Sequence, residues 1–575
     1  MKKNISLYLL FFISLSAFGQ QISCKISKSD IFQDEYKNSI MLLSEKNEKG
    51  DLVLVRSYNG NLLSQGQGFY VENYSADLKF KKGYDYEMKH PNYQKYNLIL
   101  SIFRMENNLH FVEIYYDLNE KAFICQDNIL SEDFKMTNKE LFRLSRDEMK
   151  DFGSLNIQQK FYARAKDLWV NDNSGNINSK NEQATLEMFH EVFFSRNTTY
   201  NYGAVSTSEK EGGGTDVILV TNEAKNAFAI AIDLNGAKND GLKLYLFDSK
   251  LNKKMDIMYS NNVKEKKCFF QNLQVSDDGN AIYLLAKTYI KDLKKKEEGG
   301  KYCYEYSKIS ADSQTSKQIN TDQHFIGSLK TYVHNNELVC LGFYSDVKDF
   351  KYSGICFFKL DPTTLEIKST KYSPFTEQFM TDKYGFNSSK RLINICFKKV
   401  FFTPDDEIIL NAEENYTTYS TGGFGVGGFG NTTVGGNRSM IYYNYDDIIT
   451  AKLSTAGDLL WARNINKKQS SSNDENSFLS YTSTISNDKT YFFINSNEKL
   501  KKLKNDRIEF GQIRKNKSNL NAIQVNGNGD FEFEEILDDE ENAVPFMVSN
   551  GIVIENTVYF LGRKGKSKQL LKVTL

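Results

Sequence analysis

The chain has 575 residues, and its 73 Lys and Arg residues equal its 73 Asp and Glu residues in number. This balance leaves no net field that would attract nucleic acid or an anionic membrane, so we expect neither as a partner. The length exceeds the ~100 to 200 residues of a typical domain. Only 5 Pro but 34 Tyr and 41 Phe residues favour a strand-rich protein made of several domains or of one large repeat.

The first 20 residues predict a secretory signal. Lys2 and Lys3 precede the apolar run LYLLFFISL, and the small residues Ala17 and Gly19 favour cleavage before Gln20. No later apolar run approaches the ~20 residues that span a bilayer. We therefore expect a signal peptide over residues 1–19 and a mature protein without a transmembrane segment. Its expected location is secreted or periplasmic, with attachment to the cell surface left open.

A tight polar turn between two apolar strands recurs along the chain. The turns lie around Gly50, Asn108, Asn226, Asp278, Asn336, Asp406, Asp488 and Asn556. A second kind of hairpin follows the later turns, with an apolar first strand and a more polar second strand, as in ITAKLSTAGDLLWA. Two different hairpins in a fixed order make a four-stranded unit, and such units in a radial repeat are the blades of a β-propeller.

The sequence thus predicts an all-β chain that forms a β-propeller of seven or eight four-stranded blades, and a monomer. The first blades would lie in residues 20–130 and the others in residues 188–575. The chain stops at LLKVTL after a third strand, and the mature N-terminus QISCKISKS is the candidate for the missing fourth strand. Six blades after a separate N-terminal β domain remain an alternative.

The last residues also allow a second interpretation, in which VYFLGRKGKSKQLLKVTL is an export signal. Deletion of the last eight residues separates the two interpretations. Unfolding would favour ring closure, whereas a folded protein that is not exported would favour sorting.

Residues 131–187 interrupt the repeat and predict a short helical insertion that ends in an Asn/Ser-rich loop. Thr137-x-x-Glu140 fits a capping box, and apolar residues follow at near-helical spacing, namely Leu141, Leu144, Met149 and Phe152. The insertion is expected to pack on the ring, with a lid or a partner-docking hairpin as alternatives.

The segment TGGFGVGGFGNTTVGG, residues 421–436, contains Gly425-x-Gly427-x-x-Gly430. No helix follows it, so the dinucleotide fingerprint lacks its structural context and we predict no cofactor. A long surface loop with aromatic neighbours instead predicts a contact with a partner. The candidate residues are Tyr416, Tyr419, Phe424, Phe429, Tyr442 and Tyr443.

No metal site or catalytic centre is predicted. The five histidines form no His-x-x-x-His or His-Glu-x-x-His pattern, and no Cys-x-x-Cys occurs. The Asp pairs at 277–278, 405–406 and 446–447 are expected to border turns and bond the local backbone, with a shallow calcium site as the alternative. The seven cysteines are expected to be small buried strand residues, with a disulfide between Cys268 and Cys303, or between Cys340 and Cys356, as the alternative in an oxidising compartment.

One stretch carries a resemblance to known proteins. DDIITAKLSTAGDLLWARNINKK, residues 446–468, resembles the repeat of secreted bacterial β-propellers, in which a strand ends in Lys-Leu, a turn carries Gly, and Leu-x-Trp opens the next strand. Together with NDKTYFFINS it also resembles uncharacterised secreted bacterial proteins. The resemblance implies a propeller fold and export. It implies no quinone cofactor, because the only other tryptophan, Trp169, lies in the insertion.

Two functions therefore remain open. The first is a binding or scaffolding module for a protein or glycan. The second is a hydrolase or lyase that acts on an extracellular polymer at the central channel. The enzyme would need polar side chains from three or more blades to converge at the channel mouth.

Overall fold

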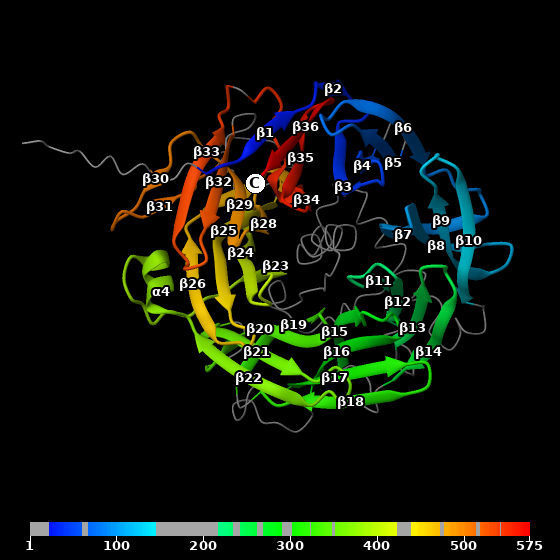
Figure 1. Cartoon of the computed structure of the whole chain (residues 1–575), viewed down its shortest axis with the longest axis horizontal. Coiled ribbons are helices and arrows are strands. Elements are labelled where there is room, and N and C mark those ends of the chain that lie inside the picture. The colour runs from blue at the N-terminus through cyan, green and yellow to red at the C-terminus, as the bar shows by residue number, and fades with distance from the viewer. Residues whose placement is uncertain are drawn as a thin grey trace, which may run out of the picture.

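The chain forms a closed ring of eight antiparallel sheets, which confirms the predicted β-propeller (Figure 1). The computed structural model describes residues 22–59, 67–144, 217–233, 242–260, 268–289, 302–321, 324–347, 351–421, 439–471, 476–512, 518–540 and 542–575. The first two blades belong to the same ring as the other six, so the alternative of a separate N-terminal domain is wrong.

In blades 1 to 7 the strands follow in chain order from the axis outward. Blade 1 has β3 (Asn38–Lys46), β4 (Leu52–Asn59), β5 (Gln67–Tyr74) and β6 (Phe80–Glu87); blade 2 has β7 (Gln94–Met105), β8 (Asn108–Asp117), β9 (Ala122–Leu130) and β10 (Met136–Leu144). Blade 3 has β11 (Val217–Thr221), β12 (Ala227–Asp233), β13 (Leu242–Asp248) and β14 (Lys253–Tyr259); blade 4 has β15 (Cys268–Val275), β16 (Ala281–Tyr289), β17 (Tyr302–Ser310) and β18 (Gln314–Ile319).

Blade 5 has β19 (Phe325–His334), β20 (Glu337–Ser345), β21 (Gly354–Leu360) and β22 (Ile367–Pro374); blade 6 has β23 (Ile395–Phe402), β24 (Ile408–Thr421), β25 (Ser439–Leu453) and β26 (Leu459–Ile465), with β27 (Gln469–Ser471) on β25. Blade 7 has β28 (Thr482–Ser486), β29 (Lys489–Ser496), β32 (Asn519–Val525) and β33 (Phe531–Leu537); the small hairpin β30 (Lys501–Lys502) and β31 (Ile508–Glu509) lies between β29 and β32.

Blade 8 closes the ring with strands from both ends of the chain. β34 (Ile552–Ile554), β35 (Thr557–Lys564) and β36 (Ser567–Thr574) come from the C-terminus, and β1 (Lys25–Lys28) adds the outer strand, followed by β2 (Phe32–Gln33). β1 pairs antiparallel with β36, with Lys25 opposite Thr574. This is the closure predicted from QISCKISKS, and it covers the edge that three strands alone would leave open.

Each junction between neighbouring blades has its own hydrophobic cluster, eight in all among the described residues. Strand β12 shows how alternation builds two of them. Phe228, Ile230 and Ile232 pack toward blade 2, whereas the alanines at 227, 229 and 231 pack toward blade 4. Successive side chains of a strand point to opposite faces, so a strand with both faces apolar can lie only between two sheets.

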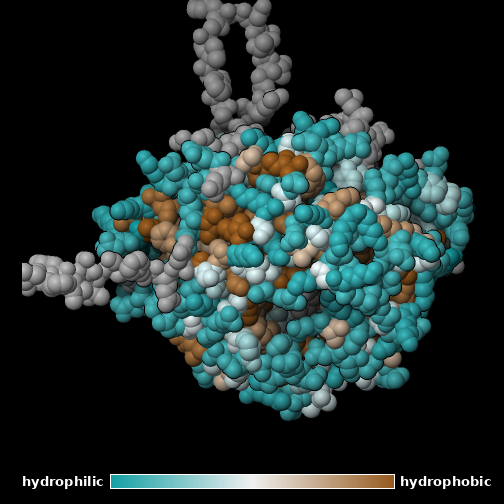
Figure 2. Space-filling view, turned by 45° about the horizontal axis from the view of Figure 1, so that its top comes forward, coloured by the Kyte–Doolittle hydropathy of each residue, from teal (hydrophilic) through white to brown (hydrophobic). Residues whose placement is uncertain are grey.

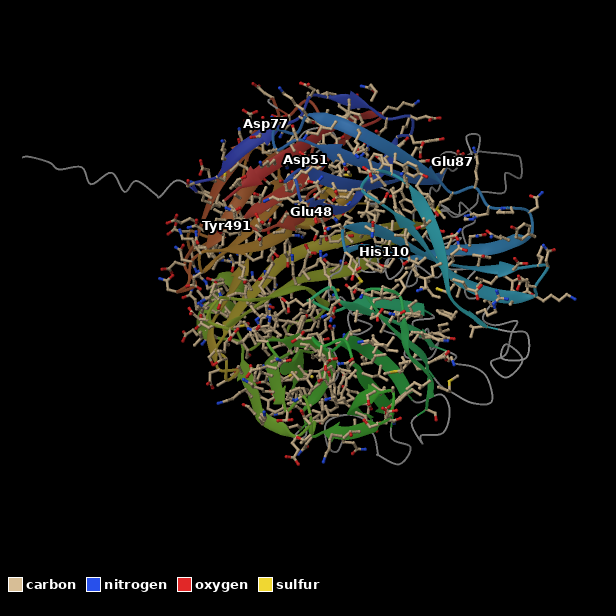
Figure 3. The ribbon with its side chains drawn as sticks, turned by 45° about the vertical axis from the view of Figure 1, so that its right-hand side comes forward. Glu48, Asp51, Asp77, Glu87, His110 and Tyr491 are labelled. Carbon is tan, nitrogen blue, oxygen red and sulfur yellow. The ribbon has the colours of Figure 1, made fainter. Side chains whose placement is uncertain are left out.

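The two faces of the ring differ. All eight predicted polar turns join the first and second strands of a blade, and the turns between third and fourth strands lie on the same side, which we call the turn face. Figure 3 shows Glu48, Asp51 and Asp77 from the turns of blade 1 on this side and Glu87, at the end of β6, on the other. The opposite side, the loop face, carries the longer connections.

Three of the inner turns have positive φ at both central residues, as two-residue hairpins of type I′ require. They are Glu106-Asn107, Asn335-Asn336 and Asn487-Asp488. Asn and Asp tolerate this conformation better than most residues because their short polar side chains bond locally. The polar turn residues are therefore the physical signal that made the blades visible in the sequence.

The helix predicted from Thr137 is wrong. Residues Met136–Leu144 form β10, the outer strand of blade 2, which also extends this blade beyond residue 130. A β-bulge falls between Glu140 and Phe142, so Leu141 and Leu144 are both buried although they lie three residues apart. The bulge imitates helical spacing. The rest of the predicted insertion, from residue 145, lies outside the described residues.

The repeat that carried the resemblance joins three blades. Gly457 has φ +87 and faces the ring of Phe357 in blade 5, where a Cβ would meet that ring at 2.0 Å. Trp461 donates its indole N–H to the carbonyl of Gly527 in blade 7 at 2.8 Å. The Gly-x-x-x-Trp element of blade 6 thus contacts both neighbouring blades, 5 and 7.

Neither alternative disulfide forms, because Cys303, Cys340 and Cys356 are free thiols. Cys268 and Cys303 both lie opposite Thr288, on the two strands that flank β16. Two strand spacings, about 9.5 Å, separate them, too far for a disulfide. Cys340 and Cys356 are diagonal neighbours on adjacent strands, and both are free thiols in the cluster between blades 4 and 5.

Candidate functional site

The predicted partner-contact residues lie around a long hairpin on the loop face of blade 6. Tyr416 lies on β24, opposite Asn444, and Tyr442 and Tyr443 lie on β25. Tyr443 is buried with Tyr445 and Leu479, and Tyr416 donates to Asp446 at 2.8 Å. Tyr419 lies on β24, but its side chain is not among the parts that the structure describes. Phe424 and Phe429 belong to residues 422–438, which lie outside the described residues. Their role in partner contact stays a prediction.

A β-bulge in this hairpin gathers carboxylates around one lysine. The register of β24 and β25 shifts at Glu414, which places it beside Asp446 and Asp447. Lys383 Nζ lies 2.9 Å from Glu414 and 2.7 Å from Asp447. The expectation that the pair Asp446-Asp447 borders a turn is therefore wrong, because both residues lie within β25. The Asp447 carboxylate pairs with Lys383 and the Asp446 carboxylate accepts from Tyr416, so neither bonds the backbone of a turn in the way predicted.

Two carboxylates share this one ammonium group in a buried position. Burial raises the pKa of Glu414 to about 7, Lys383 opposes the rise, and Asp447 adds to it. Burial alone would lower the pKa of Lys383, but Asp447 and Glu414 raise it above its ordinary value. Lys383 is therefore positively charged at neutral pH, and Glu414 is the member of the network that changes charge near neutral pH.

A second buried pair continues the network. Lys467 and Glu413 have fully buried side chains and lie 2.8 Å apart. Burial alone would raise the pKa of Glu413, but Lys467 and Lys398 hold it below its ordinary value. Ser480 also donates to Glu413, at 2.7 Å. The blade 6 hairpin is thereby tied to the segment that leads into blade 7.

The helix α4 (Glu377–Tyr384) carries Lys383 and lies against the outer strand β26 (Figure 1). Thr376 caps its first turn by accepting from Phe379 N, and Gly385 ends it with φ +82. Asp382, the residue before Lys383, accepts two hydrogen bonds from Arg463 of β26, at 2.6 and 3.2 Å. Two ionic contacts from neighbouring residues thus fix the helix to blade 6.

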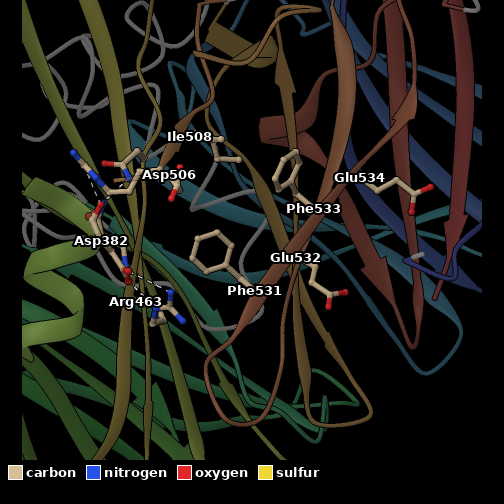
Figure 4. Close-up of a pocket in the computed structure, with 11 residues that line it drawn as sticks. Asp382, Arg463, Asp506, Ile508, Phe531, Glu532, Phe533 and Glu534 are labelled. Carbon is tan, nitrogen blue, oxygen red and sulfur yellow. Dashed lines mark hydrogen bonds and ion pairs between the residues drawn. The ribbon is translucent and has the colours of Figure 1, made fainter. Parts of the chain in front are cut away.

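A groove of about 740 Å³ opens between α4, β26 and the outer strand of blade 7 (Figure 4). The Arg463 guanidinium lies between the Asp382 carboxylate and the Phe531 ring, 4.8 Å from the ring centre. The volume falls in the ~300–1,000 Å³ range of ligand sites. The residues that line the groove are Asp382, Arg463, Asn464, Asn466, Asp506, Arg507, Ile508, Phe531, Glu532, Phe533 and Glu534.

The hairpin β30–β31 forms the third wall of the groove. Its Arg507 donates to the carbonyls of Lys383 and Asp382, at 2.8 and 3.3 Å, at the C-terminal end of α4. Phe510, which follows β31, is fully buried and contacts Phe533 edge to face at 5.5 Å. The described part of this basic segment therefore packs against α4 and blade 7 and does not project into solvent.

Apolar side chains are exposed beside this wall. Phe533 is 42% exposed and Phe386, just after α4, is 58% exposed. Figure 2 shows a surface that is mostly hydrophilic, with apolar residues gathered in parts of it. Aromatic side chains are enriched at protein–protein interfaces, so this surface is a candidate contact site.

A different polar group lies on the turn face, at the inner turns. His334 of blade 5 lies 3.3 Å from Glu223 of blade 3 and 3.3 Å from Asp406 of blade 6, and its ring stacks on Phe402. Three blades therefore converge here, as the enzyme hypothesis requires. Both ring nitrogens face carboxylates, however, so neither is available to a substrate in this arrangement.

Within the described ranges, no group of three or more His, Cys, Asp or Glu side chains could hold a metal ion. No helix in the same part of the chain is long and apolar enough to cross a membrane.

The protonation of Glu414 is expected to appear in the pH dependence of stability. A raised folded-state pKa contributes stability that is fully present below about pH 4.5 and lost as the pH rises through about 7. The stability of the wild type relative to Glu414→Gln should therefore fall across this window, by at most about 1.4 kcal/mol per pH unit. Urea unfolding from pH 4.5 to 8 measures it. Glu498→Gln, at an exposed position, is the control, and a pH dependence for Glu414→Gln no steeper than that of this control would contradict the network.

The sequence did not predict the groove between α4, β26 and β33. Asp382, Arg463 and Phe531 are more than 60 residues apart in the chain, so spacing could not bring them together. The one local signal was the helix itself, since Thr376 and Gly385 flank EQFMTDKY as helix caps do.

No protein-family model and no curated protein sequence matches the chain. Solved structures share its fold at low similarity. Pyrococcus horikoshii acylaminoacyl peptidase is 9% identical with a TM-score of 0.33, covering 83% of this chain and 52% of the peptidase. Prolyl oligopeptidase B from Galerina marginata is 10% identical with a TM-score of 0.35, covering 94% and 55%.

Chaetomium thermophilum Sqt1, solved bound to the N-terminus of the ribosomal protein L10, is 8% identical with a TM-score of 0.38, covering 94% of this chain and 98% of Sqt1. The chain spans about half the length of the two peptidases. At these values the similarities concern the propeller fold alone.

Proposed function

We propose that this protein is a binding module that holds a segment of a partner protein in the groove between blades 6 and 7. The observation that carries the proposal is the exposed ring of Phe533 in a groove of about 740 Å³ whose walls are fixed by ion pairs. Lys383, Arg463 and Arg507 hold the walls in place, so the aromatic surface is formed before a partner arrives. Such preorganisation lowers the cost of binding.

The arrangement favours a binding site over a catalytic one. The charged groups at the base of the groove already pair with each other, as Asp382 does with Arg463. Catalysis would need a positioned acid, base or nucleophile directed at a substrate. A binding site needs an aromatic side chain that a partner can cover and a polar rim, and the groove provides both in Phe533 and the charged residues around it.

Site-specific photo-crosslinking tests this proposal. A benzophenone amino acid at position 533, in the organism that makes the protein, should yield a discrete cross-linked product with a partner protein. The matched control is position 80, because Phe80 is also an exposed phenylalanine on an outer strand, with 59% exposure, in blade 1. Equal products at both positions, or none at 533, would contradict binding in the groove.

We propose further that the protein works outside the cytoplasm, secreted or periplasmic, as the pattern of residues 1–19 predicts. Fusion of these residues to a reporter should direct it out of the cytoplasm. Sequencing of the exported full-length protein should find Gln20 at its N-terminus. A cytoplasmic reporter, or an uncleaved Met1, would refute the signal peptide.

A further inference from the structure

Two neighbouring segments concentrate positive charge, although the chain as a whole is neutral. Residues 499–507, KLKKLKNDR, hold five cationic side chains and one acid, and residues 385–393, GFNSSKRLI, hold two cationic side chains and no acid. The first segment contains the tip of the hairpin β30–β31, and the second follows α4; Figure 1 shows both elements at the outer rim of the ring. The balanced charge of the whole chain thus hides a local field that attracts anionic groups.

The two segments are in direct contact. Asn505 donates to the carbonyl of Gly385 at 2.5 Å, and a Cβ on Gly385 would meet the Arg507 guanidinium at 2.7 Å. Lys504 precedes Asn505 in the hairpin, and its carbonyl accepts from Arg507 at 3.2 Å. The tip of the hairpin therefore lies beside Phe386, the residue after Gly385.

Most cations of the two segments have no ionic partner. Lys501 pairs with Glu509, and the Arg507 guanidinium donates to two backbone carbonyls at the end of α4. Asp506 is the one acid of the two segments. The exposed cations that form no ion pair with another described residue are Lys390, Arg391, Lys499, Lys502 and Lys504. Positive charge therefore exceeds negative charge on this surface.

Phe386 adds an apolar anchor among these cations. It is 58% exposed, and its ring lies 6.4 Å from the ring of Tyr384, measured between the ring centres. Lys390 Nζ lies 5.1 Å from the centre of the same Tyr384 ring. Cations from both segments thus border an exposed ring, and Phe386 is not among the residues that line the groove between blades 6 and 7.

We infer that the surface of Phe386, Lys390 and Lys504 binds an acidic segment of a partner protein. Carboxylates of the segment lie beside the two lysines, and an apolar side chain of the segment covers Phe386. This contact goes beyond the groove of the proposed function, because it uses different residues. Charged groups at an exposed rim mainly speed association, whereas an aromatic ring that becomes buried contributes most of the affinity.

The small apolar area favours a protein segment over an anionic lipid surface. Both segments are described throughout, and their large exposed apolar side chains are Phe386 and Ile393, at 58% and 50% exposure. Binding to a bilayer scales with the apolar area that enters it, and two side chains bury little there. In a protein interface, by contrast, one aromatic side chain is enough for an anchor.

Calorimetric titration of the mature protein with synthetic peptides tests this inference. The probe is acetyl-Asp-Glu-Leu-Leu-Glu-Asp-amide. One control peptide has Lys in place of the four acids, and the other has Ser in place of the two leucines and so keeps the charge. Vesicles of phosphatidylcholine and phosphatidylserine test the lipid alternative. We expect the probe to bind, both control peptides to bind about tenfold more weakly or less, and the vesicles not to bind.

Protein variants locate the contact. The double variant Lys390→Gln with Lys504→Gln should weaken binding of the probe and reduce its salt dependence, because it removes the two cations beside the ring. Phe386→Ala should weaken binding without changing the salt dependence. Thermal melting of each variant checks that it is folded.

The matched control lies in blade 1. Phe80 is 59% exposed and precedes two lysines, but these cations are engaged. Lys81 pairs with Asp51, and Lys82 donates to the carbonyl of Glu132. Phe80→Ala and Lys82→Gln should therefore leave binding of the probe unchanged.

Each outcome decides the inference. Equal binding of the Lys peptide would overturn the preference for acidic residues, and equal binding of the Ser peptide would overturn the role of Phe386 as an anchor. Binding of the vesicles alone would assign the surface to lipid, and the inference also fails if the wild type does not bind the probe. Crosslinking at position 533 tests the groove separately, so each of the two proposals can fail without the other.

Discussion

Replacement of Arg56 by Met should cost about 3–5 kcal/mol of unfolding free energy. Arg56 is 1% exposed, and its guanidinium donates to Asp34 at 2.7 and 3.1 Å and to Glu72 at 2.8 and 2.7 Å. The side chains of Asp34 and Glu72 are only 4% and 12% exposed. Loss of the cation leaves two carboxylates buried without their partner, which costs more than the pair itself contributes. Equilibrium urea unfolding measures the change.

Arg143→Met is the matched control for this prediction. Arg143 also pairs with two carboxylates, Glu120 and Glu140, but its side chain is 45% exposed. Solvent-exposed ion pairs contribute little, so we expect a change below about 1 kcal/mol. Similar losses in the two variants would show that the buried cluster has no special role in stability.

The same cluster contains a second cation, Lys568, with Nζ 3.7 Å from Asp34. Burial lowers the pKa of Lys568 to about 8, Asp34 opposes this, and Arg56 adds to it. Because Asp34 precedes blade 1, Arg56 lies in blade 1 and Lys568 lies in blade 8, the cluster fastens the N-terminal segment to both sides of the ring closure.

Removal of the N-terminal segment should have a still larger effect. A chain that starts at residue 37 lacks β1, β2 and Asp34, and it loses Ile22, which is 4% exposed in the core between blades 7 and 8. The edge of β36 would then be open, and an open apolar edge promotes association between chains. We expect loss of the cooperative unfolding transition and formation of oligomers, measured by thermal melting and size-exclusion chromatography.

Addition of the missing strand in trans makes this prediction specific. A synthetic peptide of residues 20–36 should restore a monomer and the cooperative transition. The same peptide with Ile22→Asp and Ile26→Asp should not, because both side chains pack into the core between blades 7 and 8. A truncated chain that melts like the wild type would refute the closure role of β1.

The sequence was most informative where structure is local. Polar turns such as Asn335-Asn336 have a conformational requirement that residue type reveals, so the propeller of seven or eight blades and the closing strand could be predicted. The sequence led to a wrong prediction in β10, where the bulge at Leu141 interrupts the two-residue alternation of a strand. The apolar residues around it then have the spacing of a helix.

The candidate site was harder to predict because it depends on tertiary contacts. Glu414 and Asp447 lie on strands separated by the glycine-rich loop, and Lys383 reaches them from a helix that packs beside the blade. The aromatic residues expected to meet a partner lie on or near the same hairpin of blade 6, and their role in partner contact stays a prediction. The groove lies between blades 6 and 7, and no spacing in the sequence connects the segments that form its walls.

The pairing of Lys25 with Thr574 in blade 8 has a consequence for protein engineering. Because the first and last strands are direct neighbours, a short linker could join them, and the chain could be cut at a tight turn in any other blade. Such circular permutants should keep the same ring while they shift the order in which the blades are synthesised, so the order of translation could be varied independently of the final architecture.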